Sequence, residues 1–365
     1  MATNYLGRFD AQVARVFRYA ARAAWRNPRQ VLFFSRIGAA QARSARVRAG
    51  LRKQGVQVPP LLIASITNRC NLKCRGCYAR ARKHTGWPEL TDEQWAGLFA
   101  QAKELGVSVI MLAGGEPLLR PGILDVTRRF PGIIFPLFTN GMLFDDAVIR
   151  RLRALPQVIP VLSIEGWEPE TDTRRGIGVF ETVAGAAGRL GEAGLFYGTS
   201  LTVTRRNFAA VTEEGLVQAL IGTGCRMFVF VEYTPAEPGT EELTLLPAQR
   251  TKLVEFSTGL QARSRAVFMV FPGDEEQFGG CLAAGRGFVH VGPGGSLEPC
   301  PFAPYSDVSV ATMPLKDALQ SNLLRQIRDN HAELKETRGG CALWRNREWV
   351  EALAKKSEGR GKGRG

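Results

Sequence analysis

Six short apolar runs, each followed by a segment of helical character, limit the folds that this 365-residue chain can adopt. Runs rich in β-branched and aromatic residues are typical of strands, and a helical segment between two such runs is typical of parallel strands joined by crossovers. Thr91 and Gln94 have the spacing of a capping box and mark the clearest helix start, at residues 91–105. The alternation predicts a parallel α/β sheet whose functional loops follow the carboxyl ends of the strands. The expected strands are residues 61–66, 109–112, 133–138, 158–164, 197–203 and 227–231, and the other expected helices are residues 145–155, 179–192 and 207–223.

Three cysteines follow the first expected strand, in the run ITNRCNLKCRGCY. Cys70, Cys74 and Cys77 have the spacing C-x3-C-x2-C. Three thiolates in one short loop can each bind one iron of a four-iron, four-sulfur cube and leave the fourth iron open. Zinc is the alternative, but zinc sites usually pair a C-x2-C with a second, distant pair and need four ligands. The spacing therefore favours an iron–sulfur cluster.

Four further motifs stand downstream in a fixed order: AGGEPLL (113–119), FTNG (138–141), SIEG (163–166) and SLTVTRRN (200–207). Together with the cysteine triplet they resemble the radical S-adenosylmethionine (radical SAM) enzymes, over roughly residues 61–341. The resemblance implies a partial barrel of six β/α units, which agrees with the strand count. It also implies that the open iron chelates SAM and that a low-potential donor such as flavodoxin or ferredoxin reduces the cluster. SAM is then cleaved to methionine and a 5′-deoxyadenosyl radical, which abstracts hydrogen from a substrate.

The resemblance assigns the first SAM contacts to the glycine motif. The backbone carbonyls of Gly114 and Gly115 and the carboxylate of Glu116 would accept hydrogen bonds from the methionyl ammonium group. Glycines suit this role because a residue without a side chain lets the backbone approach a ligand closely. Taken alone, the motif is an ordinary glycine turn after a strand.

Other SAM contacts are implied around the fourth strand and the cysteine loop. Ser163 and Arg175 would hold the carboxylate and ribose of SAM, since a guanidinium is a natural partner for a carboxylate. Glu165 is assigned to the same site, although the family often has Asp at this position. Many members place an aromatic residue before the third cysteine, where this chain has Gly76, so Tyr78 would contact the adenine in its place.

Three later cysteines form a second constellation. Thirteen residues separate Cys281 from Gly295, four residues separate that glycine from Cys300, and Cys341 stands in RGGCALW. This pattern resembles the auxiliary-cluster extension called SPASM, or its shortened form, twitch, and implies one auxiliary [4Fe-4S] cluster with these three cysteine ligands. The fourth ligand stays open between the substrate, a small anion, His290 and another cysteine. Three buried structural thiols are the alternative.

The net charge of +14 is concentrated at the two ends of the chain. Residues 1–57 carry eleven Arg and one Lys against one Asp, and residues 355–365 carry five basic residues against one Glu. The first segment has no strand pattern and predicts two or three helices. Its basic face is either a solvated surface of a packed helical arm or a contact for a membrane, a nucleic acid or an acidic peptide. The apolar positions at helical spacing are Val13, Val16, Phe17, Ala20 and Ala24.

These features predict four regions: a basic helical extension (1–58), a partial barrel (59–270), a small auxiliary-cluster domain (271–350) and a basic, disordered tail (351–365). The sequence shows no apolar run of membrane-spanning length and no secretory signal. Seven cysteines, three of them clustered, indicate metal ligation in a reducing compartment, and a cytoplasmic protein is expected.

The expected activity is that of a radical SAM oxidoreductase. A second cluster near the substrate radical gives a route for removing an electron, which favours oxidative modification of a peptide or protein. One alternative is a small-molecule or lipid-precursor substrate, with the basic arm contacting a membrane. The other is an electron-transfer protein that performs no SAM chemistry. Glu232 and Tyr233 follow the last strand as candidate proton acceptors, but the sequence selects neither.

Overall fold

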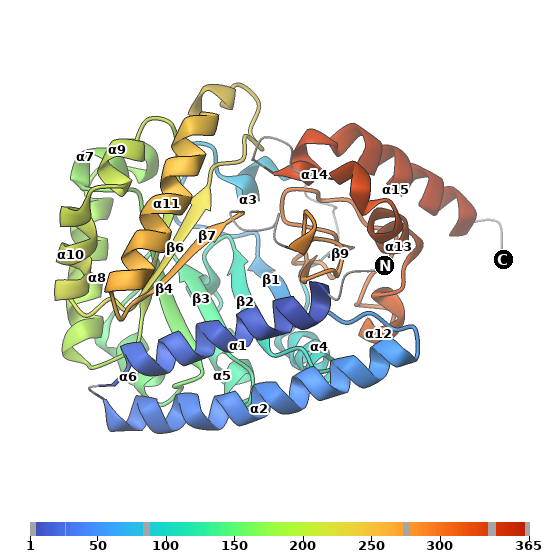
Figure 1. The fold of residues 1–365 in the computed structure, drawn as a ribbon, viewed down its shortest axis with the longest axis horizontal. Helices are drawn as coiled ribbons and strands as arrows, with labels where there is room; N and C mark the ends of the chain where they lie inside the picture. The colour runs from blue at the N-terminus through green and yellow to red at the C-terminus, as the bar shows by residue number, and fades with distance from the viewer. Residues whose placement is uncertain (1–4, 26, 83–87, 273–277, 335–340, 362–365) are drawn as a thin grey trace.

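Consecutive parallel strands form the centre of the molecule. The computed structural model describes residues 5–25, 27–82, 88–272, 278–334 and 341–361. Its sheet has the order β7-β6-β5-β4-β3-β2-β1-β8-β9, in which neighbouring strands are parallel except for the antiparallel pair β8 and β9 (Figure 1). The predicted partial barrel of six β/α units is confirmed, and β7 adds a seventh strand to it. The strands are β1 (Leu61–Thr67), β2 (Val109–Gly114), β3 (Phe135–Thr139), β4 (Val158–Ile164), β5 (Gly198–Val203), β6 (Met227–Glu232), β7 (Val267–Phe271), β8 (Phe288–Val291) and β9 (Leu297–Glu298).

Helices between the strands cover the outer face of the sheet. Trp95 and Phe99 of α4 are fully buried there, and the ring of Phe99 lies 5.5 Å from that of Phe135 on β3. The capping box of α4 is formed as predicted, because Thr91 and Gln94 each accept a hydrogen bond from the backbone of the other. The helices that follow β1 to β6 are α3 (Tyr78–Ala81), α4 (Asp92–Glu104), η1 (Pro117–Leu119), α5 (Gly122–Arg128), α6 (Asp146–Arg153), α7 (Glu168–Arg175), α8 (Val179–Glu192), α9 (Phe208–Val211), α10 (Glu214–Gly222), η2 (Glu241–Leu243) and α11 (Pro247–Arg263).

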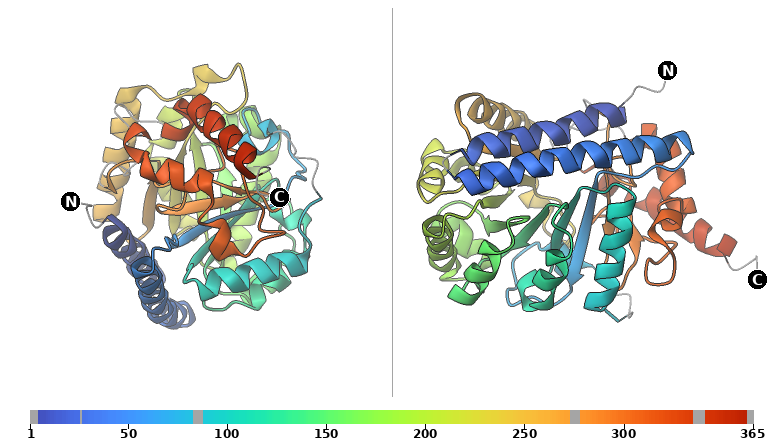
Figure 2. Two further views of the ribbon diagram at one scale, coloured as in Figure 1. Left: turned by 90° about the vertical axis from the view of Figure 1, so that its right-hand side faces the viewer. Right: turned by 90° about the horizontal axis from the view of Figure 1, so that it is seen from below.

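The basic N-terminal segment folds into two long helices, α1 (Tyr5–Ala23) and α2 (Pro28–Lys53), which lie side by side across the open side of the sheet (Figures 1 and 2). Phe17 and Ala20 of α1 and Phe34 of α2 belong to a core cluster with residues on the inner face of the sheet. We call α1 and α2 together the N-terminal hairpin. The hairpin therefore closes part of the barrel's inner face, which helices between the strands leave uncovered.

The C-terminal region continues the same sheet. Strand β8 pairs with β1 from Phe288 to Val291, and the last helices lie beyond it at one end of the molecule (Figure 2). The predicted disordered tail is wrong for residues 351–361, because these belong to α15. No helix in the described ranges is long and apolar enough to cross a membrane. The helices of this region are α12 (Leu315–Ala318), α13 (Asn322–Asp329), η4 (His331–Leu334), α14 (Ala342–Arg345) and α15 (Arg347–Gly361).

Candidate active site

A cavity of about 940 Å³ lies against the inner face of the open barrel. One end is formed by loops at the carboxyl ends of the strands, where functional residues of parallel β/α folds gather. The rest lies between the sheet and helix α1. The structure brings most of the predicted SAM-site residues together at the first end. Those that line the cavity are Cys70, Cys74, Cys77, Tyr78, Gly114, Gly115, Ser163 and Arg175.

The cysteine loop is tied down at both ends by backbone hydrogen bonds. The amide of Glu116 donates to the carbonyl of Arg69 (2.8 Å), and the amide of Arg75 donates to the carbonyl of Arg174 (2.9 Å). Burial raises the pKa of the Cys74 thiol, while nearby Arg175 and Arg174 act in the opposite direction. The positive field of these arginines favours the thiolate form that metal binding requires.

The donor set fits an iron–sulfur cube. Cys70 is influenced electrostatically by both Cys74 and Cys77, which places the three thiols near one another. A structural zinc site needs four protein ligands, whereas three thiolates suffice for a cube because each binds a different iron. The geometry therefore agrees with the cluster predicted from the spacing.

Gly114 and Gly115 are required by the close packing of β2 under the cysteine loop. Gly114 has a φ of 111°, which L side chains rarely adopt. A Cβ atom on Gly115 would lie 2.0 Å from the carbonyl oxygen of Arg69. A side chain at Gly115 would push the start of the cysteine loop away from the sheet, and one at Gly114 would press against β1.

Glu116 lies behind the cavity wall. Its side chain is fully buried, and its carboxylate accepts hydrogen bonds from the Thr139 hydroxyl (2.9 Å), the Asn140 amide (2.8 Å) and the Leu118 amide (3.0 Å). Burial raises the pKa of Glu116, against these hydrogen bonds. The carboxylate thus holds the FTNG turn, and Asn140 of that turn lines the cavity and donates to Asn71 in the cysteine loop (2.7 Å). A direct contact between Glu116 and SAM remains a prediction.

Glu116→Ala should lower the free energy of unfolding by about 1–3 kcal/mol, because buried donors on Thr139 and Asn140 lose their acceptor. Thermal unfolding measures this loss. Glu93→Ala is the control, since it removes only an exposed ion pair with Arg129, and its effect should stay below about 1 kcal/mol. A Glu116→Ala protein with unchanged stability but weakened SAM binding would instead support the direct contact.

Glu165 is also buried behind the cavity wall, where it forms ion pairs with two arginines. Its Oε1 lies 2.6 Å from Arg174 and 2.5 Å from Arg175, and both guanidinium groups line the cavity. Burial would lower the pKa of Arg175, but Glu165 together with Cys74 and Cys77 outweighs burial and the pKa is raised. Asn207, the last residue of the SLTVTRRN motif, donates to the Glu165 carbonyl (2.7 Å). The arrangement presents a fixed cation that can receive a carboxylate.

Two tyrosines stand beside the cysteine loop. Tyr78 packs edge-on against Phe302, with ring centroids 5.4 Å apart, and burial raises its pKa to about 12. Tyr233, which follows β6, was not predicted as an aromatic wall of the loop. A Cβ atom on Gly76 would lie 2.2 Å from its hydroxyl oxygen, so Tyr233 fills the space next to the position where the family has an aromatic residue.

The two candidate proton acceptors, Glu232 and Tyr233, each already interact with another side chain. Glu232 is buried and forms an ion pair with Arg250 of α11, while the Tyr233 hydroxyl donates to Thr240 (2.7 Å). Burial raises the pKa of Glu232 against the effect of Arg250. Both residues line the cavity.

The three later cysteines also come together. Cys281 and Cys300 are buried and Cys341 is half-buried. The pKa of Cys300 is raised well above its usual value, first by burial and then by contact with Cys341 and the proximity of Cys281. Pro301 and Phe302, directly after Cys300, line the cavity, so this group lies beside it. Three neighbouring thiols that are far apart in the sequence fit the predicted auxiliary cluster.

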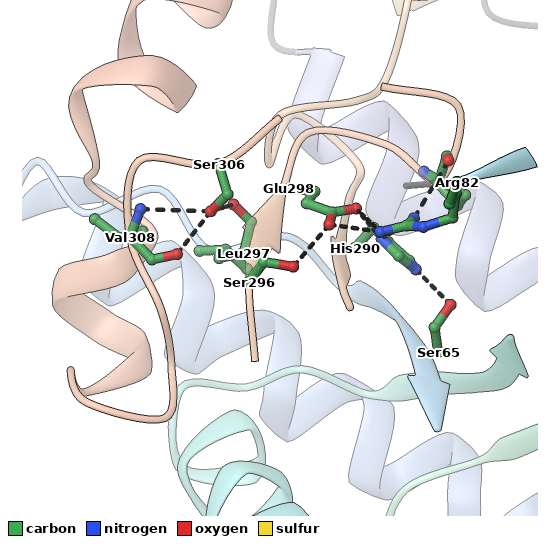
Figure 3. A network of polar contacts seen from close by, with 9 residues as sticks. Ser65, Arg82, His290, Ser296, Leu297, Glu298, Ser306 and Val308 are labelled. Carbon is green, nitrogen blue, oxygen red and sulfur yellow. Dashed lines mark hydrogen bonds and ion pairs between the residues drawn. The ribbon is translucent and has the colours of Figure 1, made fainter. Parts of the chain in front are cut away.

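His290 is removed from the candidates for the fourth ligand. Its Nε2 lies 2.7 Å from the Ser65 hydroxyl and its Nδ1 lies 2.7 Å from Glu298 (Figure 3). Arg82 also pairs with Glu298, at 2.5 Å. Burial alone would raise the pKa of Glu298, but His290 and Arg82 hold it below its usual range. With both ring nitrogens occupied, His290 joins β1 to β8 and β9 and offers no free atom to a metal.

The central part of the chain is similar to a known family. Residues 64–208 match the family model described as the Radical SAM superfamily. An AdoMet-dependent heme synthase of Methanosarcina barkeri is 25% identical over 315 residues, which cover 78% of this chain and 88% of that protein. The mycofactocin maturase MftC of Mycobacterium tuberculosis is 26% identical over 318 residues, covering 79% and 80%. A PqqA peptide cyclase of Gluconobacter oxydans is 29% identical over 254 residues, covering 66% and 70%.

Solved structures show the same fold. Streptococcus suis SuiB bound to S-adenosylmethionine superposes with a TM-score of 0.63 at 19% identity, covering 84% of this chain and 74% of SuiB. The anSMEcpe protein with bound AdoMet and a peptide gives a TM-score of 0.59 at 20% identity, covering 78% and 86%.

Proposed function

We propose that this chain, whose residues 64–208 match the Radical SAM superfamily model, binds SAM at the cysteine-lined end of its cavity and oxidises a substrate held in the remainder. The observation that carries the proposal is that the cysteine triplet, the two glycines, Ser163 and Arg175 all line that one end. A [4Fe-4S] cluster and SAM supply a 5′-deoxyadenosyl radical that abstracts hydrogen from the substrate. A low-potential donor such as flavodoxin or ferredoxin provides the electron.

Different residues of this chain bind the cluster and the different parts of SAM. Cys70, Cys74 and Cys77 hold the cluster, and the carbonyls of Gly114 and Gly115 accept from the methionyl ammonium group. Arg175, fixed by Glu165, receives a negatively charged or hydroxyl-bearing part of SAM, and Ser163 is the second polar contact. Tyr78 and Phe302 form the aromatic wall beside the loop.

The group Cys281, Cys300 and Cys341 supports an oxidative outcome. It lies beside the cavity through Pro301 and Phe302, so a cluster held there is placed to receive an electron from the substrate. This role separates the enzyme from a simple electron-transfer protein, whose clusters would need no cavity lined by SAM contacts.

Two substrate classes remain for the oxidation. A peptide or protein is the first, because the similar proteins include a mycofactocin maturase and peptide cyclases. An apolar small molecule or lipid precursor is the second, and one specific observation favours it: the cavity below the SAM end is lined mainly by aliphatic and aromatic side chains.

Ser163→Ala should weaken SAM binding about tenfold and leave iron content unchanged, because it removes one hydrogen-bonding group facing a charged ligand. Equilibrium dialysis of reconstituted, anaerobic protein against labelled SAM measures the affinity. Ser35→Ala on the exposed face of α2 is the matched control and should have no effect. Loss of iron in Ser163→Ala would mean that the residue supports the fold of the site instead.

A further inference from the structure

We propose that the part of the cavity beneath helix α1 binds the hydrocarbon chain of an anionic membrane lipid. The inference rests on the proposed function, because the chain would end at the SAM site. It assigns the N-terminal hairpin, which lies outside the matched family region, a part in substrate binding.

The walls of this space are apolar on both sides. Helix α1 contributes Val13, Val16 and Phe17, and the sheet contributes inner-face residues of β1, β2, β6 and β7. Val13, Val16 and Met269 are only half-buried although they face the interior of the molecule, because the space between the helix and the sheet is not filled by side chains. Leaving such surface against water is unfavourable, and large apolar cavities of this kind are typical of ligand sites. The sheet residues are Ile63, Met111, Val229 and Met269.

A hydrocarbon chain fits these walls better than a peptide does. A peptide brings a backbone amide and carbonyl with every residue, and each costs free energy when buried without a hydrogen-bond partner. The side chains of Ile63, Met111, Val229 and Met269 offer no such partner. A saturated or isoprenoid chain needs none and gains affinity with every methylene it buries.

Polar residues lie where α1 faces α11. Gln12 and Arg15 of α1 and Thr258 and Gln261 of α11 also line the cavity, and Arg15 is exposed. The guanidinium of Arg265, two residues after α11, lies 4.6 Å from the ring of Trp25, two residues after α1, so the ends of the two helices are neighbours. This polar rim suits a phosphate or carboxylate head group at the entrance while the chain extends inward.

The outer surface of the hairpin points to a bilayer as the source of the lipid. Its exposed side chains combine many arginines with the large apolar residues Trp25 and Leu32. Basic residues are attracted to anionic lipid head groups, and Trp is enriched at membrane–water interfaces. The exposed arginines are Arg8, Arg15, Arg18, Arg22, Arg29, Arg36, Arg43 and Arg46.

Anaerobic equilibrium dialysis of the reconstituted holoenzyme against radiolabelled palmitate tests the chain site. We expect saturable binding near one palmitate per chain, with octanoate much weaker, because each methylene contributes up to about three- to fourfold in affinity. Met269→Trp fills the cavity and should weaken palmitate binding at least tenfold. Leu32→Trp adds the same ring on the exposed face of α2 and should bind like the wild type.

A second variant keeps the test decisive if Met269→Trp does not fold. Val16→Asn changes volume little and places an amide in the apolar wall, so it should also weaken palmitate binding. Absent or non-saturable binding, or equal binding by wild type and both cavity variants, would overturn the chain site, and a peptide would then be the better occupant. SAM cleavage without palmitate binding would refute this inference alone, whereas palmitate binding without SAM cleavage would refute the proposed function.

Vesicle flotation tests the source of the lipid. The holoenzyme should float with phosphatidylglycerol vesicles and remain unbound with phosphatidylcholine vesicles. Replacing Arg18, Arg29 and Arg36 by Glu should abolish flotation and leave palmitate binding intact. Palmitate binding with no flotation on anionic vesicles would overturn the membrane source and leave a free amphiphile as the ligand.

Discussion

Holoenzyme in which Cys74 is replaced by alanine should form no 5′-deoxyadenosine from SAM under reducing conditions, and Cys70→Ala and Cys77→Ala should give the same result. Each thiolate holds a different iron of the cube, so removing one leaves the cluster without the fixed geometry that SAM chelation requires. Iron content should fall by about four per chain. The assay combines product chromatography after addition of dithionite and SAM with iron and sulfide analysis.

Cys225→Ala is the matched control for these three variants. Cys225 is fully buried behind β5 and β6, where its thiol donates to the carbonyl of Met227 (3.3 Å), and burial raises its pKa to about 11. This variant loses packing but no proposed ligand, so it should keep its iron and its substrate-free SAM cleavage. Slow SAM cleavage by any single variant of the triplet, or tightly bound zinc with no labile sulfide in the wild type, would contradict the cluster assignment.

Much of the barrel could be predicted because its signals are local. The apolar runs at residues 61–66 and 158–164 become β1 and β4, and the capping box at Thr91 forms as expected. Strand β7 has the same kind of sequence, VFMVF, but the six expected strands do not include it. The continuation of α15 to Gly361 was missed because its basic, glycine-containing sequence is also typical of disorder.

The roles of the two acidic motif residues depend on contacts that sequence does not reveal. Glu116 and Glu165 stand in motifs that contact SAM by resemblance, yet both carboxylates are fully buried and bonded to protein groups. The partners of Glu116 are Thr139 and Asn140, which lie more than twenty residues further along the chain. The place of Tyr233 beside Gly76 is likewise a contact between β6 and the cysteine loop, which no spacing rule encodes.

The N-terminal hairpin shows the same division between local and long-range information. The stripe that includes Val13, Val16 and Phe17 correctly predicted an apolar helix face. Two features depend on long-range packing: which sheet surface this stripe covers, and the unfilled space between the helix and the sheet. Both are set by the curvature of the sheet and by inner-face residues such as Val229 and Met269. Composition alone therefore indicated a basic arm, and the packing of that arm indicates a ligand site.

Cys300→Ala should remove about four irons, keep substrate-free SAM cleavage and prevent formation of the oxidised product, and Cys281→Ala and Cys341→Ala should do the same. Cleavage is retained because these thiols form a second group and none of them is a proposed ligand of the cluster that binds SAM. Product is lost because the substrate radical then has no acceptor for its electron. Iron analysis, 5′-deoxyadenosine formation and product analysis with the substrate separate the three outcomes.

Cys341 is the most informative of the three, because it is half-buried and follows residues 335–340, which lie outside the described ranges. If Cys341→Ala alone keeps all its iron, the ligand set must be completed by another group, and His290 does not supply it, since both of its ring nitrogens are already bonded to Ser65 and Glu298. If all three variants keep full iron content, these thiols are structural and the enzyme contains a single cluster. The substrate radical would then have to be resolved without a second cluster, and a redox-neutral reaction would replace the proposed oxidation.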